Sequence, residues 1–189
     1  MTVPDAPRPT AADRLPGDPD RDTLLARMIR VDQAGEYGAA RIYDGQLAVL
    51  AGSRAAAAIA RMRDREQRHL EAFDRLLVAR RVRPTLLSPL WHVAGFALGA
   101  GTALMGVRAA MACTVAVEEV IDEHYAQQSA QLGDDEAELK AVIEEFRADE
   151  QAHRDTALAY GAERAPGYRL LSAAVKAGSR AAIWLSTRL

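Results

Sequence analysis

The sequence predicts an all-α protein, and three observations support this class. Apolar residues recur at spacings of three and four along most of the chain after residue 21, and no stretch alternates with a period of two. Only 5% of the residues are aromatic, while alanine is abundant, and this composition favours helices over a β-sandwich. With 189 residues, the chain is long enough to bury one proper core.

Charge and cysteine content narrow the classes of function. The formal net charge of −2 and the pI near 6.1 give no reason to expect a nucleic-acid partner. The single cysteine, Cys113, excludes an intramolecular disulfide framework and a multi-cysteine metal site. A reducing compartment is therefore the default expectation.

The N-terminal stretch differs from the rest of the chain. It is rich in proline and charge, it lacks the apolar segment of a signal peptide, and its acidic residues are unusual for a mitochondrial transit peptide. We expect a disordered leader over residues 1–21, because such a composition cannot bury enough surface to offset the entropy of ordering. A single domain is expected over residues 22–189.

The first predicted helix covers residues 22–50, and its inward stripe includes Leu25, Ile29, Glu36 and Tyr43. The segment "AGS" at 51–53 interrupts the pattern, which resumes over residues 54–82 and ends before Pro84. A short connection between two long helices predicts an antiparallel helical hairpin.

The second half of the chain repeats this arrangement. An uncharged run over residues 85–107 predicts an additional apolar crossover helix, and helices follow over about 108–132 and 136–160. "GDD" at 133–135 suggests a C-cap glycine followed by an N-cap aspartate, and Gly161 and Pro166 close the later helix. Residues 167–189 predict a C-terminal, basic amphipathic helix. The core is thus a four-helix bundle made of two helical hairpins.

A doubled motif places charge where a core is expected. "EQRH" at 66–69 and "EQAH" at 150–153 both have the form E-x-x-H, and both lie on the inward stripe of their helices. Each is preceded by one helix with a single inward carboxylate, Glu36 in the first half and Glu118 in the second. The separations are similar, from 36 to 66 and from 118 to 150, so each hairpin brings its acidic groups to one level.

Burying four carboxylates without a counter-charge has a prohibitive desolvation cost. Two divalent cations would neutralise the four charges and offset this cost. One Glu from each of two helices and Glu-x-x-His from each of the other two is the donor set of ferritin-like di-iron or di-manganese proteins. Iron or manganese suits this mixed set better than zinc. The predicted metal ligands are Glu36, Glu66, His69, Glu118, Glu150 and His153.

Neighbouring polar residues suggest weaker hypotheses. Asp32 and Asp122, one turn from Glu36 and Glu118, are candidates to orient the ligand histidines. Tyr125 lies two turns beyond Glu118 on the same face, where a role beside the metals competes with an ordinary core position. Packing or interfacial roles are expected for His92 and His124. Solvated positions are expected for five acids: Glu119, Glu123, Glu144, Glu145 and Asp149.

The ligand set alone leaves storage, iron oxidation and organic oxygenation open. Three long stretches, "RVDQAGEYGAARIYDGQLAVL", "RVRPTLLSPLWHVAGFALGAGTALMG" and "AMACTVAVEEVIDEHY", closely resemble the demethoxyubiquinone hydroxylase family, the clock-type di-iron monooxygenases of ubiquinone biosynthesis. The resemblance runs from about residue 24 to the C-terminus, and the family's metal ligands fall on the six residues already selected. It implies hydroxylation of a polyprenyl methoxy-methyl-benzoquinol with two iron ions, O2 as co-substrate and NADH as a candidate reductant.

A cofactor fold for NADH is not evident, because "GAG" at 99–101 follows no strand and lacks the third glycine of a dinucleotide-binding fingerprint. A ferritin-like ferroxidase or iron-storage bundle is the alternative function. Storage needs no apolar surface, whereas the run over residues 85–107 is long and uncharged.

A membrane surface is the expected partner of this run. A spanning helix there would separate the two half-sites, so an interfacial or re-entrant helix is favoured over tight packing on the bundle. Trp91 and Trp184 are the expected anchors. The expected headgroup contacts are Arg169, Lys176, Arg180 and Arg188. We therefore expect a peripheral protein on the cytoplasmic side of the cell membrane, with a homodimer and an accessory ubiquinone-biosynthesis protein as further candidate partners.

Overall fold

The computed structural model describes residues 17–189, which form helices joined by short loops and contain no β-strand. The six α-helices are α1 (Arg21–Leu50), α2 (Ala56–Arg80), α3 (Ser88–Leu104), α4 (Val107–Gln131), α5 (Ala137–Ala159) and α6 (Tyr168–Ser186). Two short 3-10 turns, η2 (Asp134–Glu136) and η3 (Ala162–Arg164), flank α5. The all-α prediction is confirmed. The leader expected over residues 1–21 lies mostly outside the described residues and stays a prediction.

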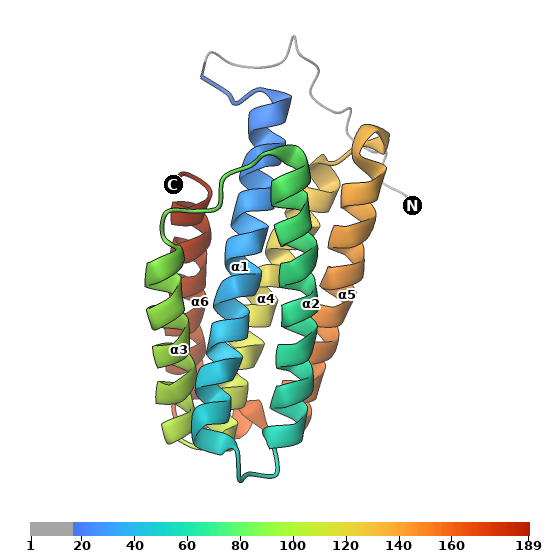
Figure 1. The fold of residues 1–189 in the computed structure, drawn as a ribbon. Helices are drawn as coiled ribbons and strands as arrows, with labels where there is room; N and C mark the ends of the chain where they lie inside the picture. Colours follow the sequence, from blue (N-terminus) through green and yellow to red (C-terminus); the bar gives the residue numbers. More distant parts are fainter. Residues whose placement is uncertain (1–16) are drawn as a thin grey trace.

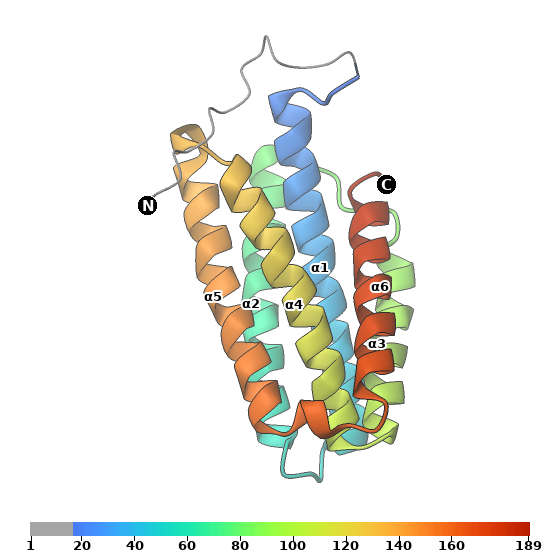
Figure 2. The ribbon, with the colours of Figure 1, turned by 180° about the vertical axis from the view of Figure 1, so that it is seen from behind.

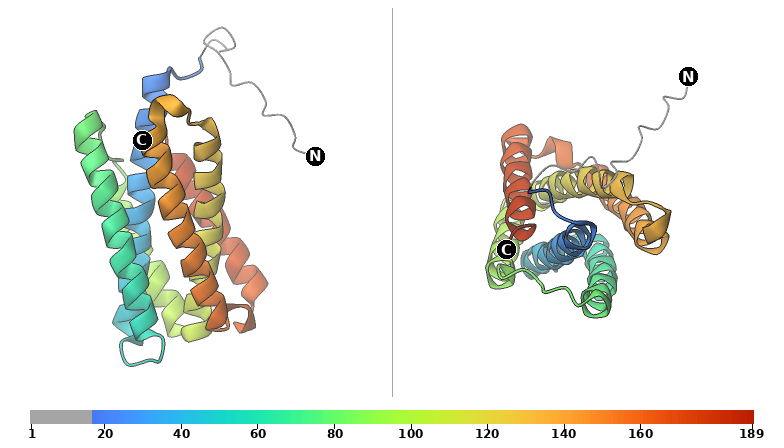
Figure 3. Two further views of the ribbon diagram at one scale, coloured as in Figure 1. Left: turned by 90° about the vertical axis from the view of Figure 1, so that its right-hand side faces the viewer. Right: turned by 90° about the horizontal axis from the view of Figure 1, so that it is seen from above.

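The helices run alternately down and up, and they form three layers of two (Figure 1). Helices α1 and α4 lie in the centre and run in opposite directions, which the reverse view also shows (Figure 2). Seen from above, α2 and α5 flank the central pair on one side, while α3 and α6 flank it on the other (Figure 3). The central pair therefore has both of its faces covered.

Helix α4 is suited to this central position because its first half consists largely of small, fully buried residues. Ala109, Ala110, Ala112 and Ala116 are all inaccessible to solvent. Short side chains let neighbouring helices approach on more than one face. Helix α4 thus packs against α5 on one side and α6 on the other.

Helix α3, which forms the apolar run, is seated on α1 through glycines. A Cβ atom added at Gly99 would lie 1.9 Å from the carbonyl oxygen of Ile42, and one at Gly45 would lie 2.2 Å from that of Phe96. Only glycine permits such close backbone approach. The opposite face of α3 exposes apolar side chains, including Leu90 and Val93. Within residues 17–189, no helix is both long and apolar enough to cross a membrane.

The helix ends agree only in part with the sequence signals. Gly161 follows α5 in the left-handed conformation (φ 83°), as expected for a terminating glycine. Gly133 does not have this role, because its φ is −102° and α4 already ends at Gln131. Helix α2 ends at Arg80, before Pro84, and its C-cap residue Arg81 takes a left-handed conformation (φ 54°).

Candidate metal centre

The six residues selected from the doubled motif meet between α1, α2, α4 and α5. Each is almost fully buried, with no more than 3% of its surface exposed. They are Glu36 on α1, Glu66 and His69 on α2, Glu118 on α4, and Glu150 and His153 on α5. The two hairpins therefore bring the six residues together at one level of the bundle, as expected.

The six residues form two overlapping groups, each able to hold one metal ion. The first group is Glu36, Glu66, His69 and Glu150, and the second is Glu66, Glu118, Glu150 and His153. Within each group, one ligand atom per residue lies within 4.8 Å of the others. Glu66 and Glu150 belong to both groups, so they are placed to bridge two ions. Glu36 and Glu118 each belong to one group, and we call them the terminal glutamates.

The two imidazoles lie among the carboxylates. The Nδ1 atom of His69 lies 3.1 Å from Glu150 Oε1 and 3.5 Å from Glu36 Oε2. The Nδ1 atom of His153 lies 3.0 Å from Glu66 Oε1 and 3.0 Å from Glu150 Oε2. Each imidazole thus contacts a carboxylate of the opposite hairpin.

The electrostatics of the cluster favour a cation. Burial, and then repulsion between the carboxylates, raise the pKa values of Glu66 and Glu118 well above their usual range. Burial alone would lower the pKa of His69, yet the close carboxylates of Glu150 and Glu36 raise it to about 10. The protein atoms alone therefore leave excess negative charge that a proton or a metal ion must compensate.

Four buried polar atoms of the histidines and shared glutamates make no hydrogen bond of good geometry among the described residues. They are Glu66 Oε1, His69 Nδ1, Glu150 Oε1 and His153 Nε2. Ion-pair contacts nevertheless place His69 Nδ1 3.1 Å from Glu150 Oε1 and His153 Nδ1 3.0 Å from Glu66 Oε1. Buried polar atoms are nearly always satisfied in native proteins, so four orphans in one cluster indicate a missing partner. Carboxylate oxygens and imidazole nitrogens are the ligand types of divalent iron and manganese. The residues present fit such an ion.

Two buried tyrosines donate hydrogen bonds to the terminal glutamates. The hydroxyl of Tyr125 donates to Glu36 Oε1, so the hypothesis that Tyr125 lies beside the cluster agrees with the geometry. The hydroxyl of Tyr43 donates to Glu118 Oε1 at 2.6 Å. Sequence reasoning missed the role of Tyr43, although it follows Glu36 by seven residues as Tyr125 follows Glu118.

The acids expected to orient the ligand histidines are not in contact with them. Asp32 binds His124 at 3.1 Å, and Asp122 accepts from Arg147 at 2.7 Å. Asp149, for which a solvated position was expected, instead contacts His69 Nε2 at 3.2 Å. The orienting role predicted for Asp32 and Asp122 and the solvated position predicted for Asp149 were therefore wrong. Helical spacing determines the face on which a residue lies but not its partner on another helix.

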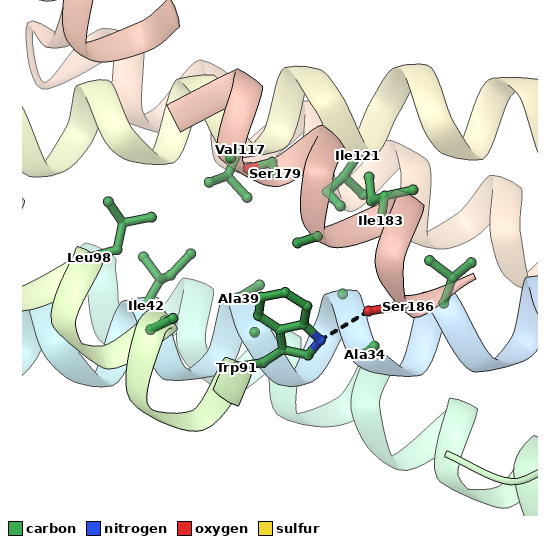
Figure 4. A pocket seen from close by; sticks show the side chains of 17 residues that line it. Ala34, Ala39, Ile42, Trp91, Leu98, Val117, Ile121, Ser179, Ile183 and Ser186 are labelled. Atoms are coloured by element: carbon green, nitrogen blue, oxygen red, sulfur yellow. Dashed lines mark hydrogen bonds between the residues drawn. The ribbon is translucent and has the colours of Figure 1, made fainter. Parts of the chain in front are cut away.

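An apolar cavity of about 360 Å³ lies on the other side of α1 and α4, between α3 and α6 (Figure 4). Its walls are almost entirely carbon, with Ile42, Leu98 and Val117 among the side chains. The indole N–H of Trp91 donates to Ser186 Oγ at 3.0 Å across one edge. Trp91 is therefore a half-buried part of the cavity wall, and its expected role as a membrane anchor stays a prediction.

The expected headgroup cations of α6 are also partly engaged. Lys176 pairs with Glu119, and Arg180 pairs with Glu123 at 2.9 Å, so two of the five acids expected to be simply solvated bind α6. Arg188 lies over the ring of Trp184, 4.2 Å from its centroid. Arg169 and Trp184 remain exposed. The expected packing role of His92 agrees with its contact to the hydroxyl of Tyr37 at 2.6 Å.

The fold and the site together define a class: all-helical bundles with a buried cluster of glutamates and histidines between the central helices. Within that class, the chain belongs to the family of the ubiquinone biosynthesis protein COQ7, whose model matches residues 23–186. The family resemblance of the sequence is thereby confirmed.

Curated relatives match over most of their length. The 3-demethoxyubiquinol 3-hydroxylase of Rhodospirillum rubrum is 59% identical over 183 residues, which cover 96% of this chain and 86% of the relative. The NADPH-dependent 3-demethoxyubiquinone 3-hydroxylase of Homo sapiens is 53% identical over 167 residues, covering 86% and 77%. The 5-demethoxyubiquinone hydroxylase of Saccharomyces cerevisiae is 41% identical over 183 residues, covering 88% and 78%.

Proposed function

We propose that this protein is a di-iron monooxygenase that hydroxylates the ring of a polyprenyl demethoxyubiquinol in ubiquinone biosynthesis. The observation that carries the proposal is the 59% identity, over nearly the whole chain, to a relative named 3-demethoxyubiquinol 3-hydroxylase. The buried Glu and His cluster beside an apolar cavity supports it independently. The iron-storage alternative is not favoured, because the relatives are named hydroxylases.

The architecture proposed for this activity is a ferritin-like four-helix bundle made of the hairpins α1/α2 and α4/α5. Its support is the inward placement of one glutamate from each of α1 and α4 and of Glu-x-x-His from each of α2 and α5. In this arrangement α3 is the crossover helix and α6 is the C-terminal amphipathic helix.

Two iron ions are the proposed occupants of the cluster. Glu66 and Glu150 would serve both ions, while Glu36 with His69 and Glu118 with His153 would complete the two groups. Bound iron supplies the reduction of O2 that oxygen insertion requires. The protein's own residues hold the ions, neutralise them with four carboxylates, and keep the site in a water-poor interior.

The overall reaction requires a reductant as well as O2. One oxygen atom enters a ring C–H bond as a hydroxyl. The other leaves as water after receiving two electrons and one proton from the reductant, as hydride, and a second proton from solvent. NADH was the candidate from the sequence, whereas mitochondrial relatives are named NADPH-dependent. We therefore propose a reduced nicotinamide nucleotide as the electron source. Activity assays with NADH and with NADPH would show which of the two is used.

The apolar cavity is the proposed seat of the substrate's prenyl tail. The cavity and the cluster lie on opposite faces of the same segments of α1 and α4. Glu36 and Glu118 belong to the cluster, and the residues directly before them, Gly35 and Val117, line the cavity. A tail bound between α3 and α6 would hold the substrate against the helices that carry Glu36 and Glu118, in an apolar lining that suits a prenyl chain.

Peripheral contact with the cytoplasmic face of the cell membrane is the proposed location, since the substrate's tail resides in a bilayer. It is supported by exposed apolar side chains on the outer flank: Leu86, Leu90, Val93, Leu104, Met105 and Trp184. Flotation with anionic liposomes tests this contact, and a protein that stays at the bottom of the gradient at low salt contradicts it. Light scattering without lipid would show whether the same surface is instead buried in a homodimer. Co-purification would show whether an accessory biosynthesis protein covers it.

Genetic complementation tests the activity directly. In a strain that lacks this hydroxylation step, expression of the chain should convert accumulated demethoxyubiquinone to ubiquinone, as mass spectrometry of extracted quinones would show. The Glu66→Gln variant is the matched negative control. Unchanged demethoxyubiquinone despite soluble, iron-loaded protein would refute the proposed reaction.

A further inference from the structure

The two central helices carry the same polar residues at the same spacing. Counting from Glu36 on α1 and from Glu118 on α4, a tyrosine follows after seven residues in each helix. A glutamine follows after ten residues in each, at positions 46 and 128. These repeats lie outside the Glu-x-x-His motifs, so the selection of metal ligands does not account for them.

In the structure, every one of these repeated residues binds the opposite half of the chain. Tyr43 on α1 donates to Glu118 on α4, and Tyr125 on α4 donates to Glu36 on α1. The glutamines cross in the same way: Gln46 Nε2 donates to Thr114 Oγ1 at 3.3 Å, and Gln128 Nε2 donates to Asp32 Oδ1 at 2.8 Å. The antiparallel contact of α1 and α4 produces this exchange (Figure 2).

The glutamates are the partners that these tyrosines require. Tyr43 and Tyr125 expose only 2% and 1% of their surface, so their hydroxyls must find acceptors inside the protein. The other contact of the Tyr43 hydroxyl is Met62 Sδ at 3.9 Å, and a thioether is a weak acceptor. Glu118 is therefore the acceptor that satisfies Tyr43.

The tyrosines bind the terminal glutamates and leave the shared ones free. Glu118 takes part in only one of the two metal-binding groups, as does Glu36. A phenol that donates to one carboxylate oxygen restricts rotation of that carboxylate and leaves its second oxygen available to an ion. Each tyrosine is thus placed to act on one metal position and not on both.

We propose that Tyr43 is a positioning residue of the metal centre, holding Glu118 for the second group of ligands as Tyr125 holds Glu36 for the first. The inference rests on the proposed function only in requiring that the cluster bind two metal ions. It adds that each hairpin orients a ligand of the other hairpin, because the tyrosine of one donates to the terminal glutamate of the other.

Metal titration tests this role without an activity assay. Metal-free protein is titrated with Co2+, whose visible absorption reports the coordination of each ion. The wild type should bind two Co2+ ions, and Tyr43→Phe should bind one of them about 10- to 100-fold more weakly, as for other groups that orient ligands. The weakened step should be the one that Glu118→Gln removes, whereas Tyr125→Phe should weaken the step that Glu36→Gln removes.

Tyr160→Phe is the matched control. Its hydroxyl donates to the carbonyl of Arg54, at 3.4 Å, and the residue follows the end of α5, seven residues beyond His153. Wild-type affinity and spectrum in Tyr43→Phe at both steps would overturn the inference, as would a lowered melting temperature with unchanged Co2+ binding. A wild type that binds no pair of Co2+ ions would overturn the metal centre itself, which is a different outcome from an unaffected variant.

Discussion

The two hairpins build the same half-site with different polar surroundings. In the first half, Asp32 lies one turn before Glu36 and is bound by His124 and Gln128. At the corresponding place before Glu118 stands Thr114, a neutral residue bound by the amide of Gln46. The two helices thus repeat the spacing of their polar residues but not the charge, because an acid precedes Glu36 and a neutral residue precedes Glu118. Mutations can therefore change the charge near one candidate metal position without changing the spacing of its ligands.

A second difference concerns the ligand histidines. His69 Nε2 contacts the carboxylate of Asp149, whereas His153 Nε2 has no hydrogen-bond partner among the described residues. The residue corresponding to Asp149 in the first motif is Arg65, which itself donates to Asp149 at 2.7 Å. An acid therefore contacts the Nε2 atom of His69 but not that of His153.

The largest expected effect comes from a residue that both halves share. Glu66→Gln should remove both metal ions and abolish hydroxylation, because Glu66 belongs to both ligand groups. Glu118→Gln should remove only one ion. Metal analysis of purified variants measures this, with Glu144→Gln on the exterior of α5 as control. Loss of a single ion in Glu66→Gln would contradict the bridging assignment.

The asymmetry of the histidines predicts a smaller effect on one half alone. Asp149→Asn should weaken binding of one Co2+ ion by about 10- to 100-fold and leave the other unchanged, since it removes the carboxylate that faces His69. Asp155→Asn, on the exposed side of the same helix, is the control. Equal weakening of both ions would mean that Asp149 acts through overall charge rather than through His69.

The polar layers of the two halves should differ in stability when truncated. Asp32→Ala leaves His124 and Gln128 without their buried partner and should cost about 1–3 kcal/mol in the free energy of unfolding. Thr114→Val should cost about 0.5–1.5 kcal/mol, because the Gln46 amide keeps its bond to the carbonyl of Ala110. Urea unfolding of the metal-free proteins compares them, and equal costs would show that the acid adds nothing.

The smallest effect is expected at the surface of the second half. Partial burial acts to raise the pKa of Asp122, but hydrogen bonds from Gln151 and Arg147 lower it below its usual value. Its contribution to stability is therefore present above the unfolded pKa and is lost as the pH falls through the folded pKa. Arg147→Met should reduce stability by less than about 1 kcal/mol at neutral pH. Urea unfolding should show this deficit shrinking as the pH falls through the lowered pKa of Asp122.

Sequence spacing identified what depends on one helix at a time. The period of 3.6 residues placed Glu66 with His69, and Glu150 with His153, on inward faces, which is where the structure has them. It could not identify Tyr43 as a partner of Glu118, because that contact depends on the register between α1 and α4.

The errors and omissions have the same physical origin. Nothing in the sequence indicated that Trp91 would bind Ser186, because this hydrogen bond depends on the docking of α6 beside α3. Asp149 was expected to be solvated, yet the packing of α5 on α2 brings it to His69. Contacts between helices distant in sequence decide both cases, and helical periodicity carries no information about them.

The close packing of α3 on α1 at Gly45 and Gly99 bears on which helix of the cavity wall can move. Since the backbones at Gly99 and Ile42 are already in contact, α3 has no room to shift toward α1. Among the described residues, two hydrogen bonds join α6 and the C-terminus to the α3 side: Trp91 to Ser186, and the N–H of Leu86 to the carbonyl of Leu189. We therefore expect a guest larger than the cavity to displace α6 outward, breaking these two hydrogen bonds, while the backbone contact with α1 keeps α3 in place.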